Sequence, residues 1–511
     1  LLQPILTFSI SMSASLESLR RWCSHHKIWI DHRIEIVSSD LSGIHLVSQS
    51  PIAQDTILVK IPREAAISLK TSRISRHIPA SASTHHGRSA QLWLALALSV
   101  ELALGPSSEW AGYLQSLPRA LSGMPLFWLG SGADGASALD FLKGTEAWRL
   151  VNETDESGAT LVEDIDAFFE AVARGVYSKV LGSSSVETLT RKDFALAYGL
   201  VSSRAFLIDA YHGLAMVPIA DAFNHVQENH VHLQSDYEVC PECGSLRQCI
   251  HDGGEDLPSE TWEDDCLEMI SNRPIESGVE VFNTYGEMLS NAQLLLQYGF
   301  ILDGNENDRV TWTCDEMAEF VHSSLHWDPA PVRQTTDWLQ SLPWEILEES
   351  SELVYIDRKH AFCVNADGTV SHGLWLYLAT ALVCSRTDIR GPTSAQEAIL
   401  SGVEHLLRCQ SGMEQHESPE HISGYTTNGS TIHQLSGLIF SLCRARSAGI
   451  SRGELTIREL GELLDSLPEE SAPSRRMAVS LALTEKSILE TCMFAWQSLA
   501  ETFVHAPDSD K

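Results

Sequence analysis

Residues 213–225 have the sequence Gly-Leu-Ala-Met-Val-Pro-Ile-Ala-Asp-Ala-Phe-Asn-His, an apolar run that ends in polar side chains. Upstream, Ser203-Arg-Ala-Phe206 closes a predicted helix over 190–207. Downstream, a run of strand character over 265–285 ends in Asn283-Thr-Tyr-Gly286. Each segment is common on its own, because Asn-His pairs often form turns and Tyr-Gly often ends a strand. The order of the three segments along one chain is more specific than any one of them, and it indicates the fold and the function.

The residues around these segments indicate a β-rich domain that is interrupted by helices. A short helix followed by strands is predicted over 16–70, where an alternating run ends at Pro62, a residue that cannot continue a central strand. Between about 75 and 212 the periodicity is helical, so the chain leaves a sheet and later returns to it. Residues 226–264 are polar and acidic and indicate a surface loop.

We therefore expect an α+β protein in three parts. Residues 1–15 are expected to be a disordered extension, since the first Met is Met12, and residues 16–300 form the β-rich domain with its helical insert. Residues 301–505 form an all-helical C-terminal domain, because amphipathic segments follow one another to the end of the chain. The helices expected in this last part cover residues 334–350, 372–385, 394–410, 430–447, 454–466 and 473–505.

The composition favours a globular protein with a basic partner. The 511 residues are 43% hydrophobic and 20% charged, and the formal net charge is −33. Such a surface repels nucleic acid and attracts basic proteins, although an acidic surface can also serve solubility alone. No stretch reaches the roughly 18 consecutive apolar residues of a spanning helix, so we expect no membrane association. Eleven scattered cysteines without a signal peptide predict a reduced protein of the cytoplasm or nucleus.

In this order, the segments around Arg204, Asn224 and Tyr285 resemble the SET-domain methyltransferases, and within them the branch typified by Rubisco large-subunit methyltransferase. The resemblance spans nearly the whole chain. Further segments that carry it are Gly43-Ile-His-Leu46, Glu109-Trp-x-x-Tyr113-x-x-x-Leu117-Pro118 and the run from Arg476 to Leu489. The resemblance implies a SET domain followed by the helical substrate-binding domain of that branch. It also implies a knot-like crossing of the Asn-His segment beneath a loop.

The resemblance further implies S-adenosyl-L-methionine as the cofactor. The cofactor-binding residues that it implies are Gly43, Ile44, His45, Leu46, Arg204, Asp221, Asn224, His225 and Tyr285. Arg204 would pair with the cofactor carboxylate, because a guanidinium binds a carboxylate through two hydrogen bonds. Asn224 and His225 would hold the amino end and the adenine, and Tyr285 would be the catalytic tyrosine beside the transferring methyl group.

The same resemblance implies a channel for the substrate lysine, formed by Ser203, Phe206, Asp221 and Tyr298. The expected activity is lysine methylation of a basic protein, such as a ribosomal, translation or histone protein, by a monomer without direct contact to nucleic acid. One alternative is a protein-histidine methyltransferase of the same fold, whose relatives tend to lack the tyrosine found here as Tyr298. Another is a non-catalytic SET scaffold, which would be expected to have lost Tyr285, Asn224 or His225.

A cysteine cluster lies inside the acidic loop and departs from the family pattern. Cys240, Cys243, Cys249 and His251 offer ligand types that suit tetrahedral zinc. The alternative is a reduced surface loop, or one that a disulfide joins. The single residue between Cys249 and His251 is a short spacing for two ligands of one metal, and Cys266 is an alternative ligand. No metal is expected in catalysis, and no cysteine cluster of the kind that closes the lysine channel in other SET branches follows Tyr285.

Overall fold

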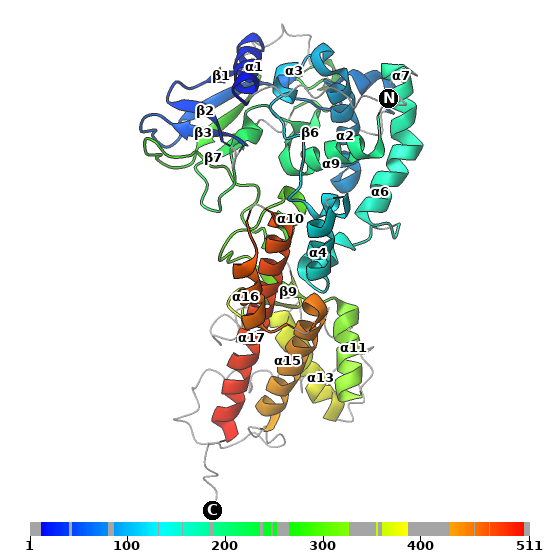
Figure 1. Cartoon of the computed structure of the whole chain (residues 1–511), viewed down its shortest axis with the longest axis vertical. Coiled ribbons are helices and arrows are strands. Elements are labelled where there is room, and N and C mark those ends of the chain that lie inside the picture. Colours follow the sequence, from blue (N-terminus) through cyan, green and yellow to red (C-terminus); the bar gives the residue numbers. More distant parts are fainter. Residues whose placement is uncertain are drawn as a thin grey trace, which may run out of the picture. The chain divides into compact units, whose positions relative to one another are not determined.

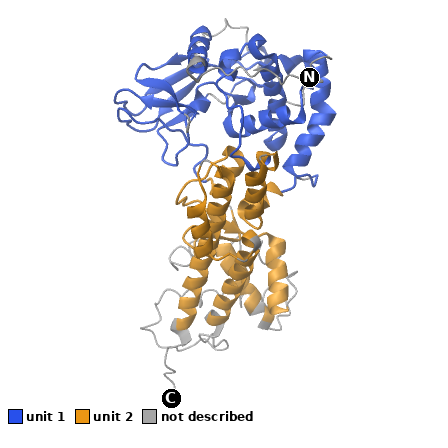
Figure 2. Ribbon diagram, in the orientation of Figure 1, with its two compact units in different colours: residues 1–126, 153–288 blue, residues 127–152, 289–511 orange. Residues whose placement is uncertain are grey.

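The computed structural model describes residues 12–39, 43–79, 86–130, 132–155, 157–182, 189–235, 239–246, 249–252, 265–326, 354–355, 360–386, 430–453, 455–469 and 471–504. The chain divides into two compact units (Figure 2). The first comprises Leu1–Leu126 and Glu153–Met288, and the second comprises Phe127–Asn152 and Leu289–Lys511. Residues 127–152, which fall inside the expected helical insert, therefore belong to the second unit.

The first unit contains antiparallel strands from both ends of its sequence (Figure 1). Early strand β4 (Ile57–Pro62) pairs with late strand β8 (Cys266–Ser271), with Ile61 opposite Leu267 and both side chains fully buried. The chain thus leaves this sheet for a helical segment and returns to it, as the sequence predicts. The other strands are β1 (Trp29–Ile30), β2 (Ile34–Ser39), β3 (Gly43–Ser48), β5 (Ala205–Asp209), β6 (Gly213–Met216) and β7 (Val231–Gln234), in the sheets β1-β4-β8-β7, β2-β3 and β5-β6.

Helix α9 (Arg191–Arg204) places the end of the insert beside the later strands. It begins with a capping box, in which the Thr190 side chain accepts from the Asp193 backbone N–H while the Asp193 carboxylate accepts from the Thr190 N–H. The helix ends at Arg204, so the expected extent to residue 207 was wrong. Residues 205–209 instead form β5, because Phe206 and its neighbours pair with Ala215 and its neighbours across a short turn. The remaining α-helices that the structure describes in this unit are α1 (Met12–His25), α2 (Gly87–Leu104), α3 (Ala111–Leu114), α6 (Leu161–Phe168) and α7 (Arg174–Leu181).

Helix α2 is the most apolar helix of the first unit. With the turn that follows it, Gly87–Ser107 is long and apolar enough by length and composition to cross a membrane, and 56% of this stretch is buried inside the protein. Glu101 within it is fully buried and accepts hydrogen bonds from the Ser108 hydroxyl at 2.7 Å and the Arg73 backbone N–H at 3.2 Å. This burial, with a satisfied carboxylate, is the pattern of a core helix in a globular protein.

The second unit is largely helical, as expected, but the prediction that it is all-helical was wrong. Four short strands form a sheet in the order β10-β12-β11-β9. They are β9 (Arg309–Thr311), β10 (Val354–Tyr355), β11 (Cys363–Asn365) and β12 (Val370–Ser371). Strands of two or three residues are too short to produce a recognisable alternation of apolar and polar residues. The available signal was the Asp-Gly turn that ends at Gly368, whose φ is +78°.

Four described helices of the second unit match predicted segments, namely α13 (His372–Arg386), α15 (Ser430–Gly449), α16 (Ile457–Ser466) and α17 (Pro473–Val504). Helix α11 (Cys314–Leu325) was not predicted. The unit also contains α4 (Gly132–Leu142), α5 (Glu146–Val151) and α10 (Asn291–Tyr298). The predicted helices over 334–350 and 394–410 lie outside the described residues. So does most of the expected extension, but α1 begins at Met12, so residues 12–15 are helical rather than disordered.

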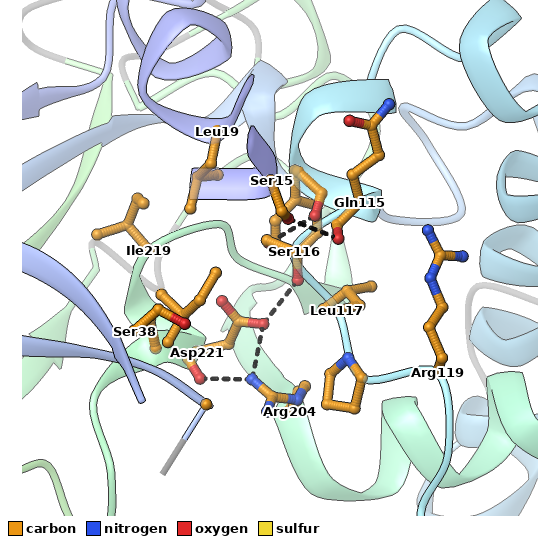
Figure 3. A pocket seen from close by; sticks show the side chains of 15 residues that line it. Ser15, Leu19, Ser38, Gln115, Ser116, Leu117, Arg119, Arg204, Ile219 and Asp221 are labelled. Atoms are coloured by element: carbon orange, nitrogen blue, oxygen red, sulfur yellow. Dashed lines mark hydrogen bonds and ion pairs between the residues drawn. The ribbon is translucent and has the colours of Figure 1, made fainter. Parts of the chain in front are cut away.

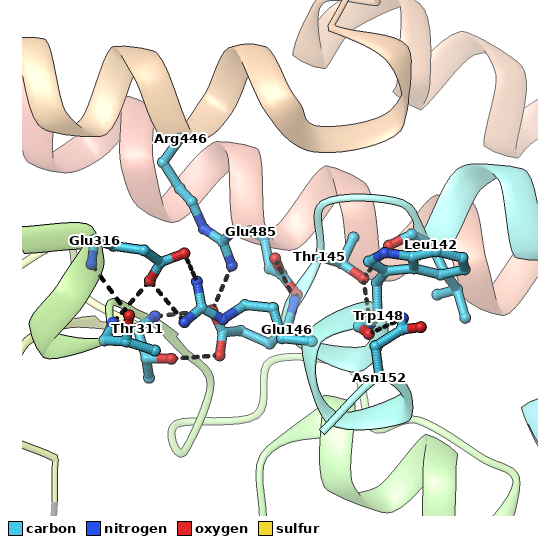
Figure 4. Close-up of polar contacts among 11 residues, drawn as sticks. Leu142, Thr145, Glu146, Trp148, Asn152, Thr311, Glu316, Arg446 and Glu485 are labelled. Carbon is cyan, nitrogen blue, oxygen red and sulfur yellow. Dashed lines mark hydrogen bonds and ion pairs between the residues drawn. The ribbon is translucent and has the colours of Figure 1, made fainter. Parts of the chain in front are cut away.

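A buried polar network holds residues 127–152 within the second unit (Figure 4). The Glu146 carboxylate accepts from the Thr311 backbone N–H at 2.9 Å, from the Thr311 hydroxyl at 2.7 Å and from Arg446 Nη2 at 2.7 Å. The Glu146 backbone N–H donates to Glu485 at 2.9 Å. Burial, followed by the charge of Glu146, raises the pKa of Glu485 well above its usual range. Two described cations face the Glu146 carboxylate, Arg446 at 2.7 Å and Arg149 at 3.9 Å, and Arg446 is the nearer.

Replacing Arg446 with methionine is expected to destabilise the second unit by about 3 kcal/mol, because the buried Glu146 loses the nearer of its two cations. Arg458→Met is the matched control, since Arg458 forms an exposed ion pair with Glu462 one helical turn away on α16. Thermal unfolding of both variants measures the effect. Equal unfolding temperatures for Arg446→Met and Arg458→Met would show that the network does not contribute to stability.

Candidate functional site

A pocket of about 300 Å³ lies in the first unit (Figure 3). Its walls come from α1, the facing ends of β2 and β3, residues 113–119, Arg204 at the end of α9, and residues 219–222. Two positions in this wall have a left-handed backbone. Gly43 has a φ of +63°, which glycine adopts without strain, whereas Ile219 has a φ of +70° although it is β-branched and buried. Backbone strain of this kind is concentrated at functional sites.

Arg204, Asp221 and Tyr113 form the polar centre of the pocket, and Figure 3 shows Arg204 beside Asp221. Arg204 Nη1 donates to the backbone carbonyl of Asp221 at 2.9 Å and lies 3.4 Å from its carboxylate. The Tyr113 hydroxyl donates to the same carboxylate at 2.8 Å. The Arg204 side chain keeps 28% of its surface exposed, whereas the Asp221 side chain keeps 4%. An anion that enters the pocket therefore meets the guanidinium, while the carboxylate behind it holds that guanidinium in place.

Ionisation of the Asp221 carboxyl is energetically unfavourable in this buried position. Burial raises the pKa of the Asp221 carboxyl, and the nearby Arg204 and the Tyr113 hydroxyl act in the opposite direction. Burial, and then the charge of Asp221, raise the pKa of Tyr113 well above its usual range, so Tyr113 remains a hydrogen-bond donor. Removing Arg204 would take the paired cation from the buried Asp221 carboxylate, and loss of one partner of a buried ion pair is strongly destabilising.

A second cluster forms where two distant segments run side by side. His225 and Asn283 form a parallel bridge, in which the Asn283 N–H donates to the Asn224 carbonyl at 2.8 Å and the Val226 N–H donates to the Asn283 carbonyl at 3.0 Å. The Tyr285 backbone N–H donates to His225 Nδ1 at 3.0 Å, and the two rings stack with centroids 5.1 Å apart. The Asn-His and Tyr-Gly segments predicted from the sequence are therefore in direct contact.

Tyr285 connects this cluster electrostatically to the pocket. Burial raises the pKa of Tyr285 to about 12, with smaller effects from the charges of Arg204, Asp221 and Glu280. The hydroxyl keeps its proton at neutral pH, so it does not act as a base, but its oxygen can still accept weak hydrogen bonds.

His225 gives the site a predictable dependence on pH. Burial lowers the pKa of His225 below the unfolded value of about 6.5. Between the folded and unfolded pKa values the unfolded chain binds more protons, so stability falls as the pH drops through about 6.5 and levels off below the folded pKa. Protonation would also remove the acceptor that the Tyr285 N–H uses.

We expect His225→Gln to lose less stability than the wild type on going from neutral to mildly acidic pH, because the group that titrates is gone. Urea unfolding of both proteins at the two pH values measures this difference. Part of the dependence remains in the variant, because burial and the charge of Arg273 also lower the pKa of His230. An identical loss in wild type and variant would contradict the role given to His225.

The other residues implied for the cofactor site occupy different positions. Gly43 and Ile44 line the pocket with Arg204 and Asp221. Leu46 is fully buried, and its carbonyl accepts from the Val281 N–H at 2.8 Å. The His45 ring nitrogen lies 3.2 Å from the Gly43 carbonyl. The roles of His45 and Leu46 stay predictions.

The residues implied for the lysine channel are only partly brought together. The Ser203 hydroxyl donates to the Gly199 carbonyl at 2.8 Å within α9, and Phe206 is a half-buried residue of β5 opposite Ala215. Tyr298 is the last residue of α10 and belongs to the second unit, with its ring centroid 6.3 Å from that of Phe300. The channel stays a prediction for these three residues, while Asp221 lies in the pocket wall.

Two residues of the site were not predicted from the sequence. Tyr113 bonds Asp221, and Glu280 Oε1 accepts from the Asn224 side-chain amide at 2.7 Å. Tyr113 stands within a segment that carries the family resemblance, which was the available signal. Glu280 lies in the alternating run that leads to Asn283, and nothing local distinguishes it from a solvent-facing strand residue.

The cysteine cluster is brought together as well. Ligand atoms of Cys240, Cys243, Cys249 and His251 all lie within 4.8 Å of one another. Cys266, the alternative ligand, is a residue of β8 and does not belong to this group. The short spacing of Cys249 and His251 does not prevent their approach, since Cys249 Sγ lies 3.5 Å from His251 Nδ1.

Comparisons of sequence identify relatives among named lysine methyltransferases, although no protein-family model matches the chain. Ribosomal lysine N-methyltransferase 3 of Saccharomyces cerevisiae is 26% identical over 352 residues, which are 55% of this chain and 60% of the yeast protein. N-lysine methyltransferase setd6 of Xenopus laevis is 25% identical over 57% of this chain and 58% of the frog protein. The matched region therefore spans less than two thirds of the length of these relatives.

Solved structures share the fold over nearly the full length. The SET domain of LSMT bound to methyl-lysine and AdoHcy superposes with a TM-score of 0.58 at 16% identity, covering 96% of this chain and 94% of that one. The same domain bound to lysine and AdoHcy gives a TM-score of 0.55 at 17% identity, covering 96% and 92%. The chain therefore shares the fold of these SET-domain structures.

Proposed function

We propose that this chain is a protein-lysine N-methyltransferase that uses S-adenosyl-L-methionine. The observation that carries the proposal is the pocket in which Arg204, Asp221, Gly43 and Ile44 meet, together with the contact between Tyr285 and His225 in the same unit. The relatives named as lysine methyltransferases and the solved structures with AdoHcy support it.

The pocket residues fit this cofactor. A volume of about 300 Å³ is at the lower end of the size range of small-molecule sites. Arg204 supplies a partly exposed guanidinium that is already oriented by Asp221, and it would hold the amino-acid carboxylate. The backbone at Gly43 and Ile44 would face the rest of the molecule, and Asn224, fixed by Glu280, would hold the amino end with His225.

Bound S-adenosyl-L-methionine supplies a methyl group on a positively charged sulfur. Tyr285 would position the acceptor and the methyl group through its hydroxyl oxygen, which is held on a rigid ring stacked against His225. The carbon–hydrogen bonds of a polarised methyl group are weak donors to such an oxygen. This contribution is orientation rather than proton transfer, because the Tyr285 hydroxyl keeps its proton at neutral pH.

The substrate lysine has to lose a proton before it can accept a methyl group. A free lysine has a pKa of about 10.4, so only about one in 2,500 is neutral at pH 7. Burial beside Tyr285 and Phe206, and a neighbouring positive charge, would both favour the neutral amine. Bulk water can then take the proton, and no strong base is required.

A basic protein is the proposed substrate class. The net charge of −33 favours binding of a positively charged partner, and the yeast relative is named as a ribosomal lysine methyltransferase. A ribosomal or translation protein is therefore the first choice, and a histone is the second. The eleven cysteines of the chain support a reducing location in the cytoplasm or nucleus.

Transfer of label tests the proposal. The full chain is incubated with methyl-labelled S-adenosyl-L-methionine and a methyl-deficient cell extract, and any labelled band is hydrolysed for amino-acid analysis. The expected result is a labelled protein band that yields methyl-lysine. Label recovered as methyl-histidine would overturn the lysine assignment, and no labelled band at any extract concentration would overturn the activity.

A further inference from the structure

The segment that holds Cys240, Cys243, Cys249 and His251 lies in the first unit, between β7 and β8, and plays no part in the proposed methyl transfer. Cys240 Sγ lies 3.6 Å from His251 Nδ1, and Cys249 Sγ lies 3.5 Å from the same nitrogen. All four ligand atoms lie within 4.8 Å of one another. Three thiols and one imidazole therefore converge on a common centre.

These separations match those of a tetrahedral zinc site. With bonds of about 2.3 Å to sulfur and about 2.0 Å to nitrogen, the corners of a tetrahedron lie about 3.5–3.8 Å apart. The two measured sulfur–nitrogen distances are in this range. Cysteine and histidine are also the ligand types that zinc selects in structural sites of three cysteines and one histidine.

The backbone around the first two cysteines is shaped as a tight loop. The Gly244 N–H donates to the Cys240 carbonyl at 2.7 Å, and the Cys240 N–H donates to the Ser245 carbonyl at 2.9 Å. These two hydrogen bonds close the loop between Cys240 and Ser245, and Cys243 lies within it.

Gly244 lies where the cysteine loop packs closely against Tyr211, another residue of the first unit. Its φ is +77°, and a Cβ atom there would lie 2.7 Å from Cδ1 of Tyr211. Tyr211 belongs to the turn between β5 and β6, where its backbone N–H donates to Asp209 at 2.9 Å and Lys70 Nζ lies 4.6 Å from its ring centroid. The cysteine loop is thus packed against the hairpin that directly follows Arg204.

We infer that Cys240, Cys243, Cys249 and His251 bind one structural zinc ion that joins residues 249–252 to residues 239–246, the loop that packs against the β5–β6 turn. Four protein ligands fill a tetrahedral site and leave no open position, so the ion has no place for a substrate or a reacting water. A disulfide would join only two of the three cysteines and would leave the convergence of the third cysteine and the histidine without a cause.

Metal analysis of the untagged full chain, purified without chelators, tests this inference. Wild-type protein is expected to contain about one zinc per chain, and Cys243→Ser less than about a tenth of that, since even supporting residues of zinc sites change affinity by about 10- to 100-fold. Cys314→Ser is the matched control, because Cys314 is an exposed cysteine on α11, away from the cluster in sequence, and should retain the zinc.

Cobalt substitution of the wild-type chain keeps the test decisive even if Cys243→Ser folds poorly. Tetrahedral coordination by thiolates is expected to give strong visible cobalt bands and a thiolate-to-cobalt charge-transfer band. Removal of the metal should also lower the unfolding temperature. Zinc-free wild-type protein, zinc content unchanged in Cys243→Ser, weak octahedral cobalt bands, or a disulfide within the cluster of freshly isolated protein would each overturn the inference.

Discussion

Tyr285→Phe is expected to reduce the rate of methyl transfer by about 10²-fold or more while leaving cofactor affinity nearly unchanged. The substitution removes only the hydroxyl oxygen, and loss of one oriented polar group at a reacting centre costs about 10²–10³ in rate. The ring can still stack on His225, and the backbone N–H can still donate to His225 Nδ1. Rates of label transfer at saturating cofactor, with calorimetric titration of the cofactor, separate the two effects.

Tyr177→Phe is the matched control for this experiment. The Tyr177 hydroxyl is also buried in the first unit and lies 2.7 Å from the Ser99 hydroxyl, outside the pocket wall. We expect the control to lose some stability and to keep its transfer rate. If Tyr285→Phe transfers label as fast as Tyr177→Phe, the hydroxyl of Tyr285 has no part in the reaction.

Arg204→Met is expected to weaken the binding of S-adenosyl-L-methionine by about 10- to 100-fold. Hydrogen bonds to charged groups contribute about 1.5–3 kcal/mol each, and Arg204 is the pocket cation that Asp221 orients. The Arg204→Lys variant should bind the cofactor with an affinity between those of the wild type and Arg204→Met, because lysine keeps the charge but cannot form two parallel hydrogen bonds to a carboxylate. Calorimetric titration of each protein gives the dissociation constants.

Arg174→Gln controls for the loss of one positive charge in the first unit. Arg174 forms an exposed ion pair with Glu170 one helical turn away, and it is not part of the pocket wall. Its cofactor affinity should equal that of the wild type. An Arg204→Met variant that binds as tightly as Arg174→Gln would show that the carboxylate of the cofactor is held elsewhere.

The parts of the site that the sequence predicts are those where several short segments follow one another in a specific order. Asn224 and His225 follow an apolar run, and Tyr285 precedes a glycine at the end of another, but each segment is common on its own, and it was their order along the chain that carried the resemblance and predicted one site. The contact between them, a parallel bridge of His225 and Asn283, agrees with that expectation. The hydrogen bond from Tyr113 to Asp221 joins residues 108 positions apart and has no local signature.

Local patterns also failed where structure depends on distant partners. The residues of β5 continue the apolar pattern of α9, and their pairing with β6 decides that they form a strand. Strands β9 to β12 are too short to be seen as alternation. At Cys249 and His251 the spacing suggested strain, yet the imidazole reaches both Cys240 and Cys249 through Nδ1, the ring nitrogen nearer the backbone.

Hydrogen exchange of the full chain with and without S-adenosyl-L-methionine is the most direct test of the cofactor site. The cofactor is expected to slow exchange in peptides that cover residues 43–48 and 219–226, because these segments form or adjoin the pocket around Arg204 and Asp221. Unchanged exchange in both segments at saturating cofactor, or protection confined to the second unit, would contradict the assignment of this pocket.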